Sequence, residues 1–251
     1  MTRIIGTIEA RMGSTRLPGK TMTPIYNGMP LLECVVRRFR ECRKIDGVIV
    51  ATTVERGDDD IAGWCDKNNV PVFRGSEEDV LDRVTGAAKH CETDAIVQMG
   101  ADSAYLDYEL IDQLAERYRG GDFDYVCNDL ELTYPLGIYG HVVRVKSLAE
   151  LSQRSGLSEK DRSDVVRHIW EHPENYSILN IEAPELLRLP ELRLTIDYPE
   201  DLEQARNVYA HFGGHLFTTR QVIELYRRKP ELFGKTRNLI QQSAPFLKAK
   251  T

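Results

Sequence analysis

Short apolar segments alternate with amphipathic segments along the first half of this chain. Residues 4–8, 48–51, 72–73 and 95–99 have the apolar character and the length of buried strands. The stretches between them carry apolar side chains at helical spacing, and the first such stripe consists of Leu31, Leu32, Val35, Val36, Phe39 and Cys42. Strands and helices that alternate in this way form parallel βαβ units in an open α/β sheet.

The same patterns place further elements within one domain that spans residues 1–251. Helices are expected after Pro30 and at about 58–69, 77–89, 108–118, 199–212 and 218–228, and strands at 124–127, 141–145, 176–181 and 192–197. The alternation is interrupted between about residues 130 and 181, which predicts an insertion of hairpin and helix. The C-terminal helix and tail occupy about residues 215–251, and we expect the tail from Lys229 to be loosely packed.

Charge is distributed unevenly along this acidic chain. Its 251 residues include 33 Lys and Arg against 39 Asp and Glu, a net charge of −6, which argues against a nucleic-acid or anionic-membrane partner. Residues 1–44 nevertheless carry nine basic side chains against three carboxylates. This local excess of positive charge predicts a small polyanionic ligand near the N-terminus.

Cysteine usage and the lack of long apolar runs indicate the compartment. The five cysteines are odd in number and none forms a CxxC pair, so neither a disulfide framework nor a zinc cluster is expected. The N-terminal segment has no apolar signal core, and no apolar run approaches the ~20 residues that a membrane span needs. We therefore expect a cytoplasmic protein with no membrane partner.

The loop that follows the first strand has the composition of an anion-binding site. From Ala10 to Lys20 it reads ARMGSTRLPGK, with two arginines, one lysine, two hydroxyl side chains and two glycines. Ligands of open α/β sheets bind at the carboxyl ends of strands, glycines let backbone N–H groups approach a phosphate, and Arg and Lys match its charge. The loop is not a GxxxxGK[ST] motif, because Ser14 stands where the first glycine should be, and it is not GxGxxG. It predicts a triphosphate site of another type, with a solvated basic turn as the alternative.

Four sequence blocks together resemble a known enzyme family. These blocks resemble, in the same order, blocks of the SpsF-like cytidylyltransferases of spore coat polysaccharide biosynthesis, which are relatives of the KDO and acylneuraminate cytidylyltransferases. In this chain they are ARMGSTRLPGK at 10–20, VATT at 50–53, VPVFRGSEEDVLDR at 70–83 and RLTIDYPEDLEQAR at 193–206. The resemblance covers about residues 3–212. It implies a Rossmann-like, glycosyltransferase-A-like nucleotidyltransferase fold that transfers CMP from CTP to an acceptor and releases pyrophosphate, with Mg²⁺ as cofactor and a homodimer as the assembly.

The chemistry of nucleotidyl transfer and the resemblance together give the candidate nucleotide site. Negative charge builds on the phosphates during attack at the α-phosphorus, so cations and N–H donors of the loop must meet it. Arg11 and Lys20 are the catalytic candidates. The nucleotide-binding candidates from the loop are Ala10, Met12, Gly13, Ser14, Thr15 and Arg16. By resemblance, Thr52, Thr53, Arg74, Gly75, Ser76, Arg83 and Gln98 complete the pocket.

Some of these residues have a structural alternative. Ser76 with Asp79 is expected to cap the helix that follows, which is sufficient to explain both side chains. Arg83 fits the surface of that helix as well as it fits a position beside the base.

Two aspartates at strand ends are candidate magnesium ligands. Asp102 follows strand 95–99 and Asp197 ends strand 192–197, and Mg²⁺ prefers hard oxygen ligands of this kind. By resemblance, Asp102 corresponds to the aspartate of a TGDCP-like turn, written GADSA at 100–104 in this chain. A strand-end aspartate is also a common helix cap, and Asp197 is placed to cap helix 199–212.

The chain departs from the family pattern on the side expected for the acceptor. Where SpsF-like proteins carry Gly-Leu-Asp-Val-Glu, Tyr139 replaces the aspartate and His141 replaces the glutamate. The loss of two carboxylates suits a more anionic acceptor, such as a phosphonate or a phosphorylated polyol, with a purely structural histidine as the alternative. The charged insertion adds Arg162 and His168 as acceptor-side candidates, with a solvated helix face as their alternative.

The leading hypothesis is a CTP-dependent cytidylyltransferase. It would join CMP to a sugar acid, a phosphorylated polyol or a phosphonate for a surface polysaccharide or glycoconjugate, so its partners are CTP and a small anionic acceptor. Two alternatives stay open at this point. One is a uridylyl- or thymidylyltransferase that acts on a sugar 1-phosphate, and the other is a catalytically silent CTP-binding module.

Overall fold

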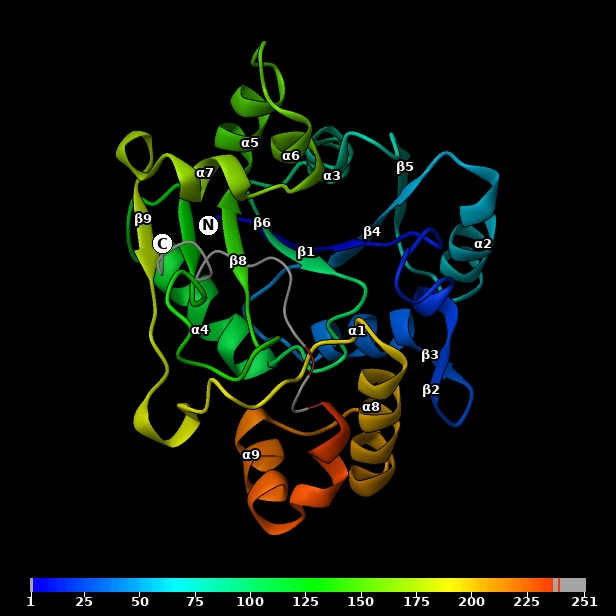
Figure 1. Cartoon of the computed structure of the whole chain (residues 1–251). Helices are drawn as coiled ribbons and strands as arrows, with labels where there is room; N and C mark the ends of the chain where they lie inside the picture. The colour runs from blue at the N-terminus through cyan, green and yellow to red at the C-terminus, as the bar shows by residue number, and fades with distance from the viewer. Residues whose placement is uncertain (1, 237–238, 240–251) are drawn as a thin grey trace.

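A mixed sheet forms the centre of the molecule (Figure 1). Within residues 2–236 and at residue 239, which the computed structural model describes, this sheet has seven strands in the order β5-β4-β1-β6-β8-β7-β9. Its strands are β1 (Ile4–Glu9), β4 (Val48–Thr53), β5 (Val72–Gly75), β6 (Ala95–Gly100), β7 (Tyr125–Cys127), β8 (His141–Arg144) and β9 (Ile178–Asn180). A separate antiparallel hairpin consists of β2 (Pro24–Tyr26) and β3 (Met29–Pro30). The expected α/β class is confirmed.

One side of the sheet is parallel, as the βαβ pattern predicts. β4 and β6 flank β1 in parallel register, and β5 continues the sheet beyond β4. β8 differs, because it lies antiparallel between β6 and β7 and places His141 directly opposite Gln98. β7 pairs in parallel with β9. The parallel pattern therefore stops at β6, and residues 130–181, expected as an insertion, contribute β8 and β9 to the sheet itself.

Helices cover both faces of the sheet (Figure 1). One buried cluster includes side chains of α1 (Leu31–Arg40), α2 (Asp59–Lys67), α4 (Tyr108–Arg119), α8 (Pro199–Phe212) and α9 (Thr219–Arg228). The other includes side chains of α3 (Val80–His90), α5 (Val145–Ser152) and α7 (Arg167–Glu171), beside which lies α6 (Glu159–Ser163). Side chains alternate along β1, so Ile4 and Ile8 enter the first cluster and Ile5 enters the second. By the same alternation, Glu9 belongs to the face that α3 and α5 cover.

The strand expected at residues 192–197 does not form. A single parallel bridge joins Leu136 and Arg193, with hydrogen bonds from Leu136 N–H to Leu192 O at 2.8 Å and from Leu194 N–H to Leu136 O at 2.6 Å. The neighbouring segment cannot extend this pairing, because Pro135 has no N–H and Gly137 turns the chain away with a φ of 99°. The prediction of a strand at this position is wrong, although the segment is buried as a strand would be.

The described part of the C-terminal tail is packed rather than loose. A 3₁₀ segment, η5 (Pro230–Thr236), lies against α8 and buries Phe233, whose side chain is 1% exposed. The prediction of a loosely packed tail is therefore wrong for this segment, and the rest of that prediction, at residues 237–238 and 240–251, lies outside the described residues. Across the part of the chain that the structure describes, no helix has both the length and the apolar character needed to cross a membrane.

Candidate active site

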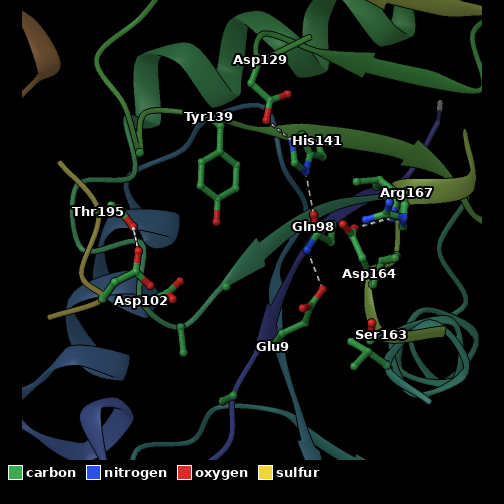
Figure 2. A pocket seen from close by; sticks show the side chains of 18 of the residues that line it. Glu9, Gln98, Asp102, Asp129, Tyr139, His141, Ser163, Asp164, Arg167 and Thr195 are labelled. Carbon is green, nitrogen blue, oxygen red and sulfur yellow. Dashed lines mark hydrogen bonds and ion pairs between the residues drawn. The ribbon is translucent and has the colours of Figure 1, made fainter. Parts of the chain in front are cut away.

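A cavity of about 950 Å³ lies at the carboxyl ends of β1 and β6. Its walls come from segments that are far apart in the sequence, namely the loop after β1, the turn after β6, the segment before β8 and the region of α6 and α7. In Figure 2, Glu9 stands between Asp102 on one side and Asp164 on the other. The fold thus gathers the charged residues of four segments around one space.

A buried aspartate holds the loop after β1 in shape. Asp58 Oδ1 accepts a 2.7 Å hydrogen bond from Met12 N–H, and its other carboxylate oxygen accepts one from the Thr53 hydroxyl at the end of β4. The Thr21 hydroxyl donates to Arg11 O at 2.8 Å. The loop therefore has a defined shape before any ligand binds. The sequence does not indicate this role, because the position of Asp58 before α2 indicates only a favourable charge at a helix start.

Two cations of this loop meet the two aspartates expected as metal ligands. Lys20 Nζ lies 2.6 Å from Asp102 Oδ2 and 3.7 Å from Asp197 Oδ1. Arg16 Nη2 lies 2.6 Å from the same oxygen of Asp197. Residues separated by about 180 positions in sequence are thus brought to one end of the cavity.

Asp197 is oriented by its neighbours and does not cap α8. Asp201 accepts hydrogen bonds from the N–H groups of Asp197 at 2.9 Å and Tyr198 at 3.0 Å, and it pairs with Arg193 at 2.8 Å. Arg193 also lies 3.3 Å from Asp197 Oδ2. The N-cap of α8 is Tyr198, and the carboxylate of Asp197 contacts Arg16, Lys20 and Arg193 in the cavity wall, so the capping alternative for Asp197 is wrong.

The other loop candidates are divided between the cavity and its support. Ala10, Arg11, Ser14, Thr15, Arg16 and Lys20 line the cavity, whereas Met12 and Gly13 are not among its lining residues. Arg11 is half exposed and lies 3.8 Å from Glu77. The N–H of Ser14 already donates to Met12 O at 2.9 Å, so it stabilises the loop.

The candidates at the ends of β4 and β5 hold these strands together. Arg74 Nε donates to Thr53 O at 2.8 Å, and the same guanidinium pairs with Asp59 at 2.8 Å. Asp79 is the N-cap of α3 and accepts from Asp82 N–H at 2.8 Å, while Ser76 Oγ accepts from Asp79 N–H at 3.0 Å. The capping role is confirmed for Asp79, but the helix begins at Val80 and Ser76 is not its cap. Thr52, Thr53, Arg74, Gly75 and Ser76 are not among the residues that line the cavity.

Arg83 belongs to the cavity wall and not to a helix surface. It is 2% exposed, lines the cavity, and donates to Ser76 O. Burial lowers the pKa of its guanidinium, and the neighbouring carboxylate of Glu9 opposes that shift. Arg83 is thus a buried positive charge beside the loop.

Four side chains cross the base of the cavity in one hydrogen-bonded row, which we call the floor row (Figure 2). Gln98 Nε2 donates to Glu9 Oε1 at 2.6 Å, Gln98 Oε1 lies 2.7 Å from His141 Nδ1, and His141 Nε2 lies 3.0 Å from Asp129 Oδ2. Burial raises the pKa of Glu9 to about 7 despite the hydrogen bond from Gln98. Burial alone would lower the pKa of His141, but the carboxylate of Asp129 outweighs it and the pKa is raised.

Tyr139 lies beside the floor row. Its hydroxyl is 2.9 Å from Ser103 Oγ, and its ring centroid is 5.1 Å from that of His141. Burial raises the pKa of Tyr139, so its phenol is neutral.

Arg162 and His168 lie outside the cavity lining. Arg162 Nη1 is 2.9 Å from an Asp79 carboxylate oxygen and donates to Ser152 O at 2.9 Å. His168 Nε2 is 3.0 Å from a guanidinium nitrogen of Arg154. The same region lines the cavity instead with Lys160, Ser163, Asp164, Val165, Val166, Arg167 and Trp170.

Comparisons with known proteins identify the family. A sequence profile described as Cytidylyltransferase matches residues 5–237. The spore coat polysaccharide biosynthesis protein SpsF of Bacillus subtilis is 35% identical over 238 residues, which cover 92% of this chain and 97% of that protein. This chain belongs to the cytidylyltransferase family.

Further relatives agree in sequence and in structure. A 3-deoxy-manno-octulosonate cytidylyltransferase of Hydrogenovibrio crunogenus is 26% identical over 90% of this chain and 91% of that protein. The structure of a cytidylyltransferase from Leptospira borgpetersenii matches with a TM-score of 0.87 at 26% identity and covers 97% of this chain and 100% of that one. The expected nucleotidyltransferase fold is confirmed, and the protein is a CTP-dependent nucleotidyltransferase.

The donor set of this cytidylyltransferase fits Mg²⁺ shared with a nucleotide. Among the described residues, no group of three or more His, Cys, Asp or Glu side chains is placed to hold a metal ion. Asp102 and Asp197, however, both face the ammonium group of Lys20, so a positive charge already lies between them. Mg²⁺ often takes only one or two carboxylates and completes its shell with phosphate oxygens and water.

Three carboxylates at the cavity of the cytidylyltransferase are not among the residues that the sequence pointed to: Glu9, Asp129 and Asp164. Burial raises the pKa of Asp164, as it does for Glu9. The alternation along β1 could have identified Glu9, because it shares the buried face of Ile5. No comparable signal marks Asp129, which reaches the site only because β8 enters the sheet beside β6.

Proposed function

We propose that this cytidylyltransferase transfers CMP from CTP to a small anionic acceptor, with Mg²⁺, in the biosynthesis of a surface polysaccharide or glycoconjugate. The observation that carries the proposal is the convergence of Arg16 and Lys20 with Asp102 and Asp197 at one end of the cavity. The relatives support it, since one is named for spore coat polysaccharide biosynthesis and another for a sugar acid. The candidate acceptors are a sugar acid, a phosphorylated polyol and a phosphonate.

The reaction is an in-line displacement at the α-phosphorus of CTP. An acceptor oxygen forms a bond to this phosphorus while the bond to the oxygen that bridges to the β-phosphate breaks, and pyrophosphate leaves. Lys20 and Arg16 line the cavity, where they offset the negative charge that develops on the phosphates, and Arg11 adds a third cation at the more exposed edge. Loss of one such preorganised donor typically costs about 3–4 kcal/mol of transition-state stabilisation.

Asp102 and Asp197 would hold Mg²⁺ in this reaction. When bound, the ion supplies further positive charge to the transferred phosphoryl group. In its absence Lys20 and Arg16 compensate the two carboxylates, so these cations would exchange carboxylate for phosphate partners when the nucleotide and its metal bind.

The direct test is pyrophosphate release from CTP, UTP and dTTP. Each nucleotide is supplied with a sugar acid, a phosphorylated polyol, a phosphonate and a sugar 1-phosphate. Release that requires CTP and one of the first three acceptors is expected. Release from UTP or dTTP with a sugar 1-phosphate would replace the proposal, and CTP binding without turnover for every acceptor would identify a silent module.

The homodimer also stays a prediction. Sedimentation equilibrium is expected to give twice the chain mass of 28.6 kDa. A mass of one chain across the working concentration range would contradict it.

A further inference from the structure

The placement of the Gln98 amide, with Nε2 toward Glu9 and Oε1 toward His141, gives the hydrogen bonds of the floor row one direction. Both ring nitrogens of His141 face acceptors, the carbonyl oxygen of Gln98 and the carboxylate of Asp129. Only the doubly protonated imidazolium donates from both nitrogens, and the raised pKa of His141 agrees with that form. The amide nitrogen of Gln98 then points away from His141 and donates to Glu9. The row therefore ends in a carboxylate on each side, with the positive charge between them.

This arrangement leaves His141 with no N–H group to offer to a ligand. The side chain is 7% exposed, and both of its N–H groups are taken by members of the row. The neighbouring hydroxyl of Tyr139 is engaged with Ser103. The gain of a phenol and an imidazole in this chain thus does not build an anion-binding site, contrary to the expectation from the sequence.

Glu9 is the end of the row that faces the reaction centre. It is the last residue of β1, lies opposite Gly100 in the register, and directly precedes the triphosphate loop. Its Oε1 accepts from Gln98, and within the described part of the chain no hydrogen bond to its Oε2 is found. The guanidinium of Arg83 acts to lower its pKa, whereas Asp164 and Asp102 act to raise it. The cavity therefore presents a hydrogen-bond acceptor beside the proposed metal ligand.

We propose, on the basis of the function proposed above, that Glu9 is a specificity-determining residue of the acceptor site. Its second carboxylate oxygen accepts a hydrogen bond from a hydroxyl group of the acceptor, and the row that runs to Asp129 holds it in this orientation. A phosphonate or phosphate oxygen in the same place is anionic, has no proton to donate, and is repelled by Glu9 and Asp164. The acceptor that fits is one that presents a hydroxyl group at the reaction centre, as a sugar acid does.

Glu9→Gln tests this proposal, because it replaces a hydrogen-bond acceptor that faces the cavity by a hydrogen-bond donor of nearly the same size. The new amide oxygen takes the hydrogen bond from Gln98, so the new amide N–H groups face the cavity as donors. The assay is run at pH 8, above the raised pKa of Glu9 of about 7, so that its carboxylate is ionised. The ratio of kcat/KM for 3-deoxy-manno-octulosonate to that for 2-aminoethylphosphonate, measured by pyrophosphate release with CTP, is expected to fall about tenfold or more. The KM for CTP is expected to stay within about twofold. Glu9→Asp keeps an acceptor and should keep the wild-type preference.

The possible results separate the two proposals. One result is that the wild-type protein turns over neither sugar acids nor phosphonates and phosphorylated polyols. In that case the proposed function fails, and the inference on Glu9 fails with it. If the wild-type protein is active and Glu9→Gln leaves the ratio of kcat/KM for the two acceptors unchanged, only the inference on Glu9 is overturned. A large rise in the KM for CTP with equal losses for every acceptor would place Glu9 against the nucleotide, which also overturns it. Glu116→Gln, on the exposed face of α4, is the matched charge control.

Discussion

Replacement of Glu9 by glutamine should change how protein stability depends on pH. The pKa of this partly buried carboxyl is raised from 4.5 to about 7, so between these values the folded protein keeps a proton that the unfolded chain has released. Because the folded state then binds more protons than the unfolded state, stability is fully present below pH 4.5 and falls as the pH rises through this window. A shift of about 2.5 pH units at 1.36 kcal/mol per unit corresponds to about 3 kcal/mol.

Glutamine does not ionise, so the variant should lack this slope. The free energy of unfolding of both proteins is measured in urea at several values between about pH 5 and pH 8. From the low to the high end of this range, the free energy of unfolding of Glu9→Gln is expected to rise by about 2–3 kcal/mol relative to that of wild type. His141 is present in both proteins, and because Glu9 helps to raise the pKa of His141, the difference between them reports Glu9 together with its coupling to His141. The exposed control Glu116→Gln should follow the wild-type curve. Parallel curves for wild type and Glu9→Gln would refute the reasoning, because ionisation of Glu9 would then cost the folded state nothing.

Three further predictions concern the loop and the proposed metal. Asp102→Asn should abolish pyrophosphate release while the circular dichroism spectrum stays native, and an active variant would show that Asp102 is not a metal ligand. Chelation by EDTA should stop turnover by the wild type and added Mg²⁺ should restore it, whereas undiminished turnover in EDTA would exclude the metal from the reaction. Asp58→Ala should raise the KM for CTP and lower the free energy of unfolding by about 2–4 kcal/mol. The reason is that Met12 N–H and the Thr53 hydroxyl lose a buried partner. Unchanged values in urea unfolding and CTP titration would show that Asp58 does not hold the loop.

The parallel half of the fold is predictable from the sequence because its signals are local. The apolar stripe of α1 and the short apolar runs of β1, β4 and β6 are each readable within a few residues. The rules for βαβ units then give the handedness of the crossovers and leave only a few possible strand orders. The same holds for the loop from Ala10 to Lys20, whose composition indicates an anion site and whose cavity-lining residues the structure brings together.

The parts that could not be predicted depend on pairing between distant segments. Whether residues 192–197 form a strand is decided by Pro135 and Gly137, which lie about 57 residues away in the bridging segment and limit the pairing to one bridge. Whether Asp197 caps α8 or faces the cavity depends on Arg16 and Lys20, about 180 residues away, whose side chains contact its carboxylate. Neither outcome is visible in the local pattern of either segment.

The floor row shows how these two kinds of information combine. Alternation along β1 places Glu9 on a buried face, and alternation along β6 does the same for Gln98, since Ile5 and Ile96 belong to one buried cluster. A carboxylate at such a position costs free energy unless it is paired and hydrogen-bonded. What the sequence lacks is the antiparallel entry of β8, which sets His141 opposite Gln98 and supplies the positive charge that the row needs. Glu9 is unfavourable by burial alone, and it is stabilised through β8, a strand whose direction no local sequence signal indicates. For this reason Glu9, which we propose to select the acceptor, is not among the residues that the motifs indicate.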